Sequence, residues 1–446
     1  MKDGDTIYAF STSPGRAAIA VLRLSGPDAG GALKALGGKL PKPRQAAVMM
    51  FADPRSGEAI DRGIALYFPK PSSHTGEDMA ELHLHGGRAV ANAALEALGA
   101  IPGLRLAEPG EFTRRAFLNG KLDLTEAEGV ADLIAAETAA QRRQALRQMS
   151  GAAAKIHEDW RRRILLAQAR LEAEIDFPEE GLPENLRKAA AAEIATLRDE
   201  IGASLKDKRG GEILREGFHV AILGPPNAGK SSLMNALARR EVAITSETAG
   251  TTRDVIEVAL DLGGYPVMLA DTAGLREAEG AIEEEGVRRA RKRAETADLK
   301  LAVLDASKPG EAKALGGFFG GDTLVVANKM DLNPKDGAAW ADALGSGKAV
   351  RISVKTGRGL DEVESRLRDE VAARLSSGAA PLITRARHRQ ALEECAASLA
   401  RFSGITAPEL AAEELRRAVR ALGRLTGRVD VEDLLDVLFR EFCIGK

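Results

Sequence analysis

A phosphate-binding pattern, G-x-x-x-x-G-K-[ST], lies in the middle of the chain at Gly224-Pro225-Pro226-Asn227-Ala228-Gly229-Lys230-Ser231. The apolar run before it, residues 218–223, predicts a strand, and the run after it, residues 231–237, predicts a helix. In that context the glycines let main-chain N–H groups approach phosphates. Lys230 then supplies a charge at the β and γ phosphates, and Ser231 offers a hydroxyl to Mg²⁺. We therefore expect a nucleoside triphosphate site here.

Two polar loops follow in the order that a nucleotide-driven switch requires. Gly250-Thr251-Thr252-Arg253-Asp254 precedes a predicted strand, and Thr252 is a candidate second hydroxyl ligand of Mg²⁺. Asp271-Thr272-Ala273-Gly274 follows an apolar run, where Asp271 can hold the water shell of the metal and the Gly274 N–H can contact the γ-phosphate. A chance glycine-rich turn at residues 224–231 would not bring these loops with it.

The run Asn328-Lys329-Met330-Asp331 follows another apolar run and predicts guanine recognition. A carboxylate at Asp331 can accept hydrogen bonds from guanine N1–H and the 2-amino group, whereas adenine lacks that pair of donors. Taken alone, such a run is also found in ordinary loops. Ser353-Val354-Lys355 predicts the last loop on the guanine side. With all of these motifs in sequence order, we expect a GTP-hydrolysing protein.

The residue after the second switch motif is Leu275, which cannot orient a water molecule as the glutamine of many regulatory GTPases does. Residues 277–285 carry several carboxylates, although most of them fit a solvated helix start. The charge that develops on the phosphates calls for a cation. One source is an arginine finger, and the other is a monovalent cation held by Asn227 and main-chain carbonyls of residues 246–251.

Strand-like and helix-like runs alternate from about residue 214 to 375 and predict a doubly wound, mostly parallel sheet. Segments rich in Ala, Leu, Glu, Gln and Arg flank this region and predict packed helices. Nearer the N-terminus we expect strands at 18–24, 63–68 and 81–85 and a helix at 89–98. The predicted domains are an α/β domain at 1–120, a helical part at 121–212, an inserted GTPase domain at 213–376 and a second helical part at 377–446.

The net charge of −2 argues against a protein that coats nucleic acid through excess positive charge, but not against a local basic patch. The two cysteines, Cys395 and Cys443, are far apart, so neither a disulfide framework nor a zinc site is expected. No apolar run of membrane-spanning length and no signal peptide is evident, and we expect a cytoplasmic protein.

Several blocks outside the nucleotide motifs carry a more specific likeness. They are PGRAAIAVLRLSG, TGEDMAELHLHGG, PGEFTRRAFLNGKLDLTEAE and the C-terminal FCIGK, and with them come GPPNAGKSSLMN, AGTTRD, DTAGLR and NKMD. Through these blocks the chain resembles, almost end to end, the MnmE (TrmE) family of tRNA-modification GTPases. The resemblance implies an N-terminal folate-binding-like α/β domain, a helical domain and a GTPase domain inserted into the latter.

The resemblance also implies a homodimer formed through the N-terminal domains, with GTPase domains that pair when potassium and GTP are bound. Asn227 and carbonyls near Ser246, Thr248 and Thr251 would hold K⁺. Glu283 would orient the attacking water, with Glu284 and Glu285 as its rivals. The GTP-binding set is then Gly224, Asn227, Ala228, Gly229, Lys230, Ser231, Ser232, Ser246, Glu247, Thr248, Ala249, Gly250, Thr251, Thr252, Asp271, Thr272, Ala273, Gly274, Asn328, Lys329, Asp331, Ser353, Val354 and Lys355.

The family's activity is shared with an FAD-dependent partner, MnmG (also called GidA), in a heterotetramer. Together they add an aminomethyl or carboxymethylaminomethyl group to C5 of the wobble uridine of certain tRNAs. A tetrahydrofolate derivative, in the 5-formyl or 5,10-methylene form, is the implied one-carbon carrier. The positions that match the family's folate site are Arg23, Glu81, Lys121 and Lys446. Without the resemblance, each of these would be interpreted as an ordinary surface charge.

Other residues admit two interpretations. Cys443, in the C-terminal tail beside Lys446, is a candidate reactive thiol or a small apolar residue at a helix end. Cys395 is expected in a helical core. His83 and His85 alternate on a predicted strand, but no third metal ligand is in view.

The arginines at 416, 420, 424 and 428 form a basic stripe that suits tRNA if one helix runs through them. A solvated face paired with Glu413, Glu414 and Glu432 is the more ordinary interpretation. A rival to the tRNA-modifying enzyme is a regulatory switch in ribosome assembly, in which the GTP state controls docking and no covalent chemistry occurs. The N-terminal blocks and FCIGK favour the enzyme, because a switch needs neither a folate pocket nor a terminal thiol.

Overall fold

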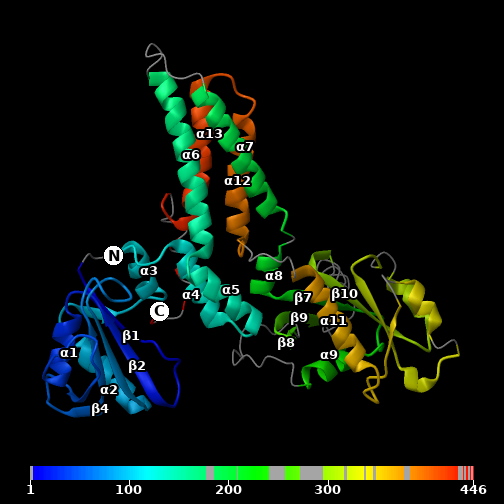
Figure 1. Ribbon diagram of the computed structural model, residues 1–446. Helices are drawn as coiled ribbons and strands as arrows, with labels where there is room; N and C mark the ends of the chain where they lie inside the picture. The colour runs from blue at the N-terminus through cyan, green and yellow to red at the C-terminus, as the bar shows by residue number, and fades with distance from the viewer. Residues whose placement is uncertain are drawn as a thin grey trace, which may run out of the picture. The chain divides into compact units, whose positions relative to one another are not determined.

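The structure is a computed structural model, and it describes residues 4–176, 185–207, 209–240, 257–271, 295–315, 319–335, 338–344, 348–375, 382–429 and, in the C-terminal tail, 435, 438, 439, 442 and 445. The chain divides into two compact units (Figure 1). The first comprises Met1–Ala131, Gln148–Ala190 and Ile405–Lys446, and the second comprises Asp132–Arg147 and Ala191–Gly404.

The first unit contains a six-stranded sheet in the order β3-β4-β5-β2-β1-β6. Neighbouring strands are antiparallel, except that β1 and β6 are parallel. The strands are β1 (Thr6–Phe10), β2 (Ala17–Ser25), β3 (Ala47–Ala52), β4 (Ala59–Phe68), β5 (Met79–Gly86) and β6 (Leu104–Leu106). The predicted strands at 18–24, 63–68 and 81–85 are confirmed as β2, β4 and β5. Strand β3 was not anticipated, because it is apolar on both faces and so lacks the alternation that marks a strand.

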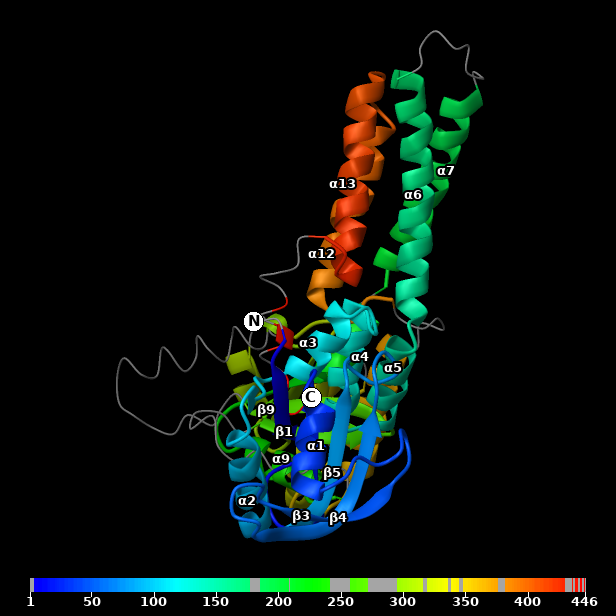
Figure 2. The same cartoon turned by 90° about the vertical axis from the view of Figure 1, so that its left-hand side faces the viewer.

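Helices cover the two faces of this sheet unequally. Helices α1 (Ala29–Gly37) and α2 (Arg88–Gly99) pack on one face through Leu33, Leu98 and their neighbours, and α2 confirms the helix predicted at 89–98. Helix α3 (Glu111–Leu118) inserts Phe112 against Ile7 of β1 on the other face. Figure 2 shows this sheet with β3 and β4 at its lower edge.

Long helices follow, as the sequence predicts. They are α4 (Leu124–Ala135), α5 (Ala139–Met149), α6 (Ala152–Asp176) and α7 (Asn185–Leu205), then α12 (Ala386–Phe402) and α13 (Pro408–Thr426) near the C-terminus. In the first unit α6 and α13 lie side by side (Figures 1 and 2) and are in extensive contact. Trp160 and Ile164 of α6 are buried, as are Leu415 and Leu422 of α13, because apolar residues recur on one face of each helix.

The second unit contains a six-stranded sheet in the order β12-β11-β10-β7-β9-β8, in which only the β8–β9 pair is antiparallel. Its strands are β7 (Phe218–Leu223), β8 (Glu257–Leu262), β9 (Tyr265–Asp271), β10 (Leu299–Asp305), β11 (Thr323–Asn328) and β12 (Val350–Arg351). Short helical turns η1 (Pro309–Leu315), η2 (Met330–Leu332) and η3 (Ala339–Ala343) follow the later strands, and α8 (Gly210–Glu216) precedes β7.

Both faces of the second sheet are covered. Leu301 and Val303 of β10 belong to one apolar core with helices α9 (Lys230–Ala238) and α11 (Leu360–Leu375). Ala302 and Leu304 of the same strand belong to the core on the opposite face. A parallel sheet buried on both faces is the doubly wound architecture that the alternation of strands and helices predicts, and the predicted fold class is confirmed.

Candidate nucleotide-binding and folate-binding sites

The phosphate loop is formed where β7 ends at Leu223 and α9 begins at Lys230. Gly224 and Gly229 both have positive φ, at 156° and 97°. A Cβ at Gly224 would lie 2.2 Å from the Val303 carbonyl oxygen, and one at Gly229 would lie 2.3 Å from Nδ2 of Asn328. Only glycine therefore fits at these two positions, both sterically and conformationally.

Lys230 is buried within this loop, where its Nζ donates hydrogen bonds of 2.9 Å to the carbonyl oxygens of Gly224 and Pro225. Those contacts hold the ammonium group inside the curve of the loop. A positive charge in that place, together with the N-terminus of α9, suits the oxygens of a phosphate chain.

Asn328, the last residue of β11, connects two loops that are far apart in the sequence. Its Nδ2 donates to the Ala228 carbonyl at 2.8 Å, and its Oδ1 accepts from the Val354 N–H at 3.2 Å. The side chain is buried, so both contacts are protected from water. Asn328 thus fixes the spacing between the phosphate loop and the loop at 353–355.

Asp331 lies in η2 and its side chain contacts that of Ser353. The Ser353 hydroxyl donates to Asp331 Oδ1 at 2.7 Å, and the same hydroxyl accepts from the Thr356 N–H at 3.3 Å. These contacts orient the carboxylate at the end of the parallel strands, which is where ligands bind in doubly wound sheets.

Asp305 is part of this site and was not anticipated from the sequence. It is the last residue of β10, is buried, and lies opposite Asn328 in the strand register. Its Oδ2 accepts from Lys329 Nζ at 2.8 Å, and its Oδ1 accepts from the Ser307 hydroxyl at 2.7 Å. Burial acts to raise the pKa of Asp305, but the hydrogen bonds from Lys329 and Ser307 outweigh it and the pKa is lowered. The signal available in the sequence was an aspartate directly after the apolar run 301–304.

Two of the four candidate folate residues are brought together in the first unit. Arg23 on β2 lies opposite Glu81 on β5, and Arg23 Nη2 is 2.9 Å from Glu81 Oε1. Lys121, which follows α3, donates from Nζ to the Pro71 carbonyl at 3.0 Å. Arg23 also lies over the ring of Phe112, 5.9 Å from its centroid.

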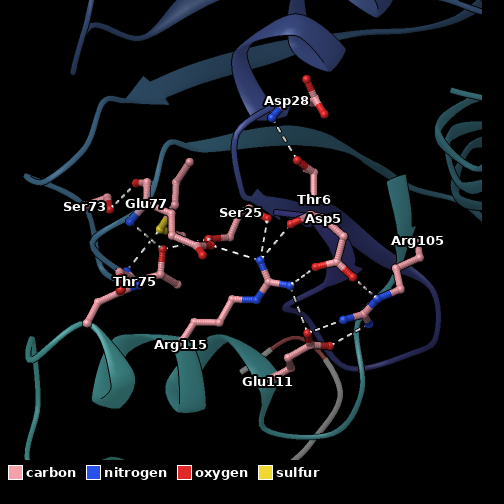
Figure 3. A network of polar contacts seen from close by, with 12 residues as sticks. Asp5, Thr6, Ser25, Asp28, Ser73, Thr75, Glu77, Arg105, Glu111 and Arg115 are labelled. Carbon is pink, nitrogen blue, oxygen red and sulfur yellow. Dashed lines mark hydrogen bonds and ion pairs between the residues drawn. The ribbon is translucent and has the colours of Figure 1, made fainter. Parts of the chain in front are cut away.

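A partly buried ionic network joins α3 to the first sheet in the same unit (Figure 3). Arg115 contacts Asp5 at 2.6 Å, Glu111 at 3.0 Å and Glu77 at 3.1 Å, and Arg105 contacts both Asp5 and Glu111. Ser25 extends the network by donating to Glu77 Oε2 at 2.7 Å. These contacts fix α3, and hence Phe112, against the sheet that carries Arg23 and Glu81.

Comparisons with known proteins cover nearly the whole chain. Residues 124–443 match the family model described as the MnmE helical domain, and residues 6–121 match the model described as GTP-binding protein TrmE N-terminus. The tRNA modification GTPase MnmE of Parvibaculum lavamentivorans is 58% identical over 99% of this chain and 100% of that protein. The chain belongs to the MnmE (TrmE) family of tRNA modification GTPases.

Two further relatives also match this chain over nearly its whole length. The tRNA modification GTPase MnmE of Paramagnetospirillum magneticum is 54% identical over 99% of this chain and 100% of that protein. A human mitochondrial protein, the GTPB3 subunit of 5-taurinomethyluridine-[tRNA] synthase, is 48% identical over 99% of this chain and 94% of that protein.

Part of the site expected for an MnmE family member lies outside the described residues. Asp271 is described as the last residue of β9, where it lies next to Ile222 of β7 in the register. The residues outside the description are Ser246, Glu247, Thr248, Ala249, Gly250, Thr251, Thr252, Thr272, Ala273, Gly274, Leu275, Glu283, Glu284, Glu285, Cys443 and Lys446.

The other singled-out residues have structural partners. Cys395 is fully buried in α12, as expected, and burial raises the pKa of its thiol to about 12. His85 Nδ1 lies 2.9 Å from Asp61 Oδ1, and His83 Nε2 lies 3.5 Å from Glu81 Oε2. Within the described ranges, no group of three or more His, Cys, Asp or Glu side chains is placed to hold a metal ion.

The four C-terminal arginines do not lie on one helix, which was the condition for a continuous basic stripe. Helix α13 ends at Thr426 because Gly427 takes the left-handed conformation at φ 80°, so Arg428 lies beyond the helix. Arg416 pairs with Glu172 and Glu413, which agrees with a solvated, paired face for that part of α13. None of the helices in the described part of the chain is both long enough and apolar enough to cross a membrane.

Proposed function

We propose that this MnmE-family protein binds GTP through the loops around Lys230 and Asp331 and hydrolyses it in the course of tRNA modification. The observation that carries the proposal is the position of Asn328, whose side chain contacts both the phosphate loop and the loop of Ser353. That bridge sets the distance between a triphosphate position and a base position. Ser353 then presents the Asp331 carboxylate to the N1–H and 2-amino donors of guanine.

The metal ions follow from the same loops. We propose that Mg²⁺ is held by Ser231 and Thr252, since hydroxyl oxygens suit this hard cation. K⁺ would be held by Asn227 and main-chain oxygens of the loop at 246–251, with Glu283 orienting the attacking water. Asn227 supports this assignment because it is exposed on the phosphate loop, at a left-handed φ of 61°. When bound, the two cations would neutralise charge on the triphosphate.

The tRNA chemistry is proposed from the family resemblance. With an FAD-dependent MnmG partner, the protein would add an aminomethyl or carboxymethylaminomethyl group at C5 of the wobble uridine. The human relative is a subunit of a 5-taurinomethyluridine-[tRNA] synthase, and this name supports position 5 of a uridine as the site of modification. We assign Cys443 a role in this chemistry and none in GTP hydrolysis.

A folate carrier fits the residues around Arg23. A carboxylate such as Glu81 suits the amino edge of a pterin, and cations such as Arg23, Lys121 and Lys446 suit a formyl oxygen or a glutamate tail. The ion pair between Arg23 and Glu81 on neighbouring strands supports the assignment, because it keeps both groups ordered on one face of the sheet. When bound, the folate would supply the one-carbon unit.

A homodimer through the N-terminal domain is supported by an open apolar area on the first sheet. Val48 and Met50 of β3 are 62% and 56% exposed, and Ile64, opposite Val48 on β4, is 38% exposed. Large apolar side chains that gather on an exposed sheet face indicate a protein–protein interface. We propose that a second copy of the chain covers this face.

The experiment that tests the tRNA function uses a strain that lacks this protein, complemented with the wild-type chain or with Cys443→Ser. Nucleosides from its tRNA are analysed by mass spectrometry, and GTP hydrolysis is measured on the purified proteins. We expect modified wobble uridine with the wild type only, and equal GTP hydrolysis by both proteins. Full modification with Cys443→Ser would rule out a chemical role for that thiol, and unmodified tRNA with the wild type would refute the function.

A further inference from the structure

A hollow of about 430 Å³ lies in the first unit between α6 and the end of α13. It is lined by residues of α6 from Ala154 to Arg162, by Thr426 and Arg428, and by Asp123 just before α4. Helix α13 ends beside the hollow, where Gly427 takes the left-handed conformation of a C-cap and Arg428 follows beyond the helix. This turn is packed closely, since a Cβ at Gly427 would lie 2.6 Å from the Phe117 ring.

The carboxylates around the hollow are already matched by partners. Both oxygens of Glu158 accept from Arg161, at 2.9 and 2.8 Å. Asp159 accepts from Arg162 at 2.7 Å. Asp123 Oδ1 caps the start of α4, where it accepts from the Thr125 hydroxyl and the Glu126 N–H.

Two cations at the hollow have no carboxylate to themselves within the described part of the chain. Lys155 is exposed and makes no ion pair there, although the charge of Glu126 is close enough to interact with it. Arg428 is 56% exposed, and among the described residues its ion-pair partner is Glu158 at 3.5 Å, which Arg161 already engages on both oxygens. The lining carries three cations (Lys155, Arg162 and Arg428) and three carboxylates (Asp123, Glu158 and Asp159), and Lys155 and Arg428 are the cations least engaged by the described carboxylates.

Thr426 supplies a neutral hydrogen-bond donor at the same place. It is 6% exposed, and its hydroxyl has no hydrogen-bond partner within the described part of the chain. A buried hydroxyl without a partner costs about 1–3 kcal/mol, so an acceptor brought by a ligand would recover that energy.

We propose that this hollow binds a phosphate group of the tRNA backbone, with Lys155 and Arg428 as the charged contacts and the Thr426 hydroxyl as a donor. The inference rests on the proposed function, in which tRNA is the substrate. Cations on flexible stems beside a hydroxyl are the groups with which proteins contact nucleic-acid phosphates. An open hollow on the surface admits a phosphate of a long polyanion as well as a free ion.

Arg416 and Arg417, which lie earlier in α13, are less suited to this role. Arg416 pairs with Glu172 at 2.9 Å, and Arg417 pairs with Glu414 at 3.1 Å. A tRNA phosphate at these positions would have to displace carboxylates that already compensate the charge. Arg428 lies instead past the end of α13 and Lys155 lies on α6, and neither has a carboxylate to itself among the described residues.

The test is the salt dependence of tRNA binding by the full-length protein, measured by fluorescence anisotropy with an unmodified tRNA transcript. In the double variant Lys155→Gln, Arg428→Gln we expect weaker binding, and the slope of log K against log salt should fall by about one for each cation removed. The matched control is Arg416→Gln, an arginine of similar exposure on α13 whose charge is already paired. It should leave both affinity and slope unchanged.

Thr426→Val removes the hydroxyl but keeps the side-chain shape. If the hydroxyl donates to a phosphate, this variant should bind tRNA more weakly, with the same salt slope and no loss of thermal stability. Competition with inorganic phosphate distinguishes a tRNA backbone phosphate from a free phosphate ion as the ligand. If inorganic phosphate releases tRNA no better than another salt at equal ionic strength, the result supports the backbone phosphate.

If the wild-type protein and the double variant bind tRNA equally well, the phosphate site is refuted and the proposed function is unaffected. Saturation of the hollow by inorganic phosphate without any change in tRNA affinity would overturn the site as well. Wild-type protein that binds no tRNA would count against the proposed function itself.

Discussion

At the scale of single residues, the nucleotide site depends on side chains that have two partners each. Asn328 holds the phosphate loop and the loop at 353–355 together, and Ser353 holds Asp331. Asp305 holds Lys329 in the same way from the end of the neighbouring strand. Because each contact limits where its partner can lie, the proposed base position is held in shape by the protein itself, which would reduce the entropy that binding costs.

The role of Asp331 can be tested by Asp331→Asn. The amide offers one acceptor in place of the carboxylate that accepts from two guanine donors, so the affinity for GTP should fall by about a hundredfold. Xanthosine triphosphate carries a carbonyl where guanine has its 2-amino group, and the variant should prefer it. Competition binding with fluorescent nucleotides measures this exchange. An unchanged preference for GTP would refute the role of Asp331 in base recognition.

The potassium assignment is tested by exchanging the salt. Hydrolysis in KCl should exceed hydrolysis in NaCl of equal ionic strength by at least about tenfold, because the smaller ion fits carbonyl and amide oxygens spaced for K⁺ poorly. Asn227→Ala should remove this difference, and phosphate release is the measurement. Equal rates of the wild-type protein in the two salts would exclude a potassium site.

At the scale of elements, α3 is held to the first sheet by ionic contacts as well as by Phe112. Arg115 and Glu111 of α3 are almost fully buried and meet Asp5, which precedes β1, and Arg105 of β6 (Figure 3). Burial acts to raise the pKa of Glu111, but hydrogen bonds from Arg105 and the Glu108 N–H outweigh it, so the pKa is lowered in the folded state. The carboxylate therefore stabilises the fold at neutral pH, and that contribution is lost as the pH falls through its folded pKa.

Arg115→Met should lower the free energy of unfolding of the N-terminal part by about 3–5 kcal/mol, because it leaves buried carboxylates without their partner. Glu111→Gln should make stability less dependent on pH below about 4.5, the ordinary pKa of glutamate. Urea unfolding followed by circular dichroism at several pH values measures both effects. The control is Arg55→Gln in the exposed pair with Asp53, which should change little. If Arg115→Met lowers the free energy of unfolding no more than the control does, the network does not hold α3.

At the scale of the whole molecule, the open apolar face of the first sheet predicts the state of assembly. Val48→Glu with Met50→Glu places two charges on exposed positions, so the fold should survive while a dimer formed through this face should dissociate. Light scattering coupled to size-exclusion chromatography should find a dimer for the wild type and a monomer for the variant. A variant that remains dimeric would locate the interface elsewhere.

The sequence alone determined the features that depend on neighbours in the chain. The glycines and Lys230 of the phosphate loop, the strands with apolar runs and the helices with regular apolar spacing all follow from local backbone preference and periodicity, which a few adjacent residues decide. The fold class followed from their order, because strands that alternate with helices are packed as a parallel sheet.

Only the tertiary structure decided which distant residues meet. Asp5 and Arg115 are 110 positions apart, and Asn328 and Ala228 are 100 apart, so no spacing in the sequence reveals either contact. Arg428 leaves the stripe that its spacing suggested, because α13 ends at Thr426, two residues earlier, at a glycine packed against Phe117. Burial and charge compensation depend on the neighbours that folding brings together. For that reason the hollow beside α6, which brings Lys155 and Arg428 together, is found in the structure and not in the sequence.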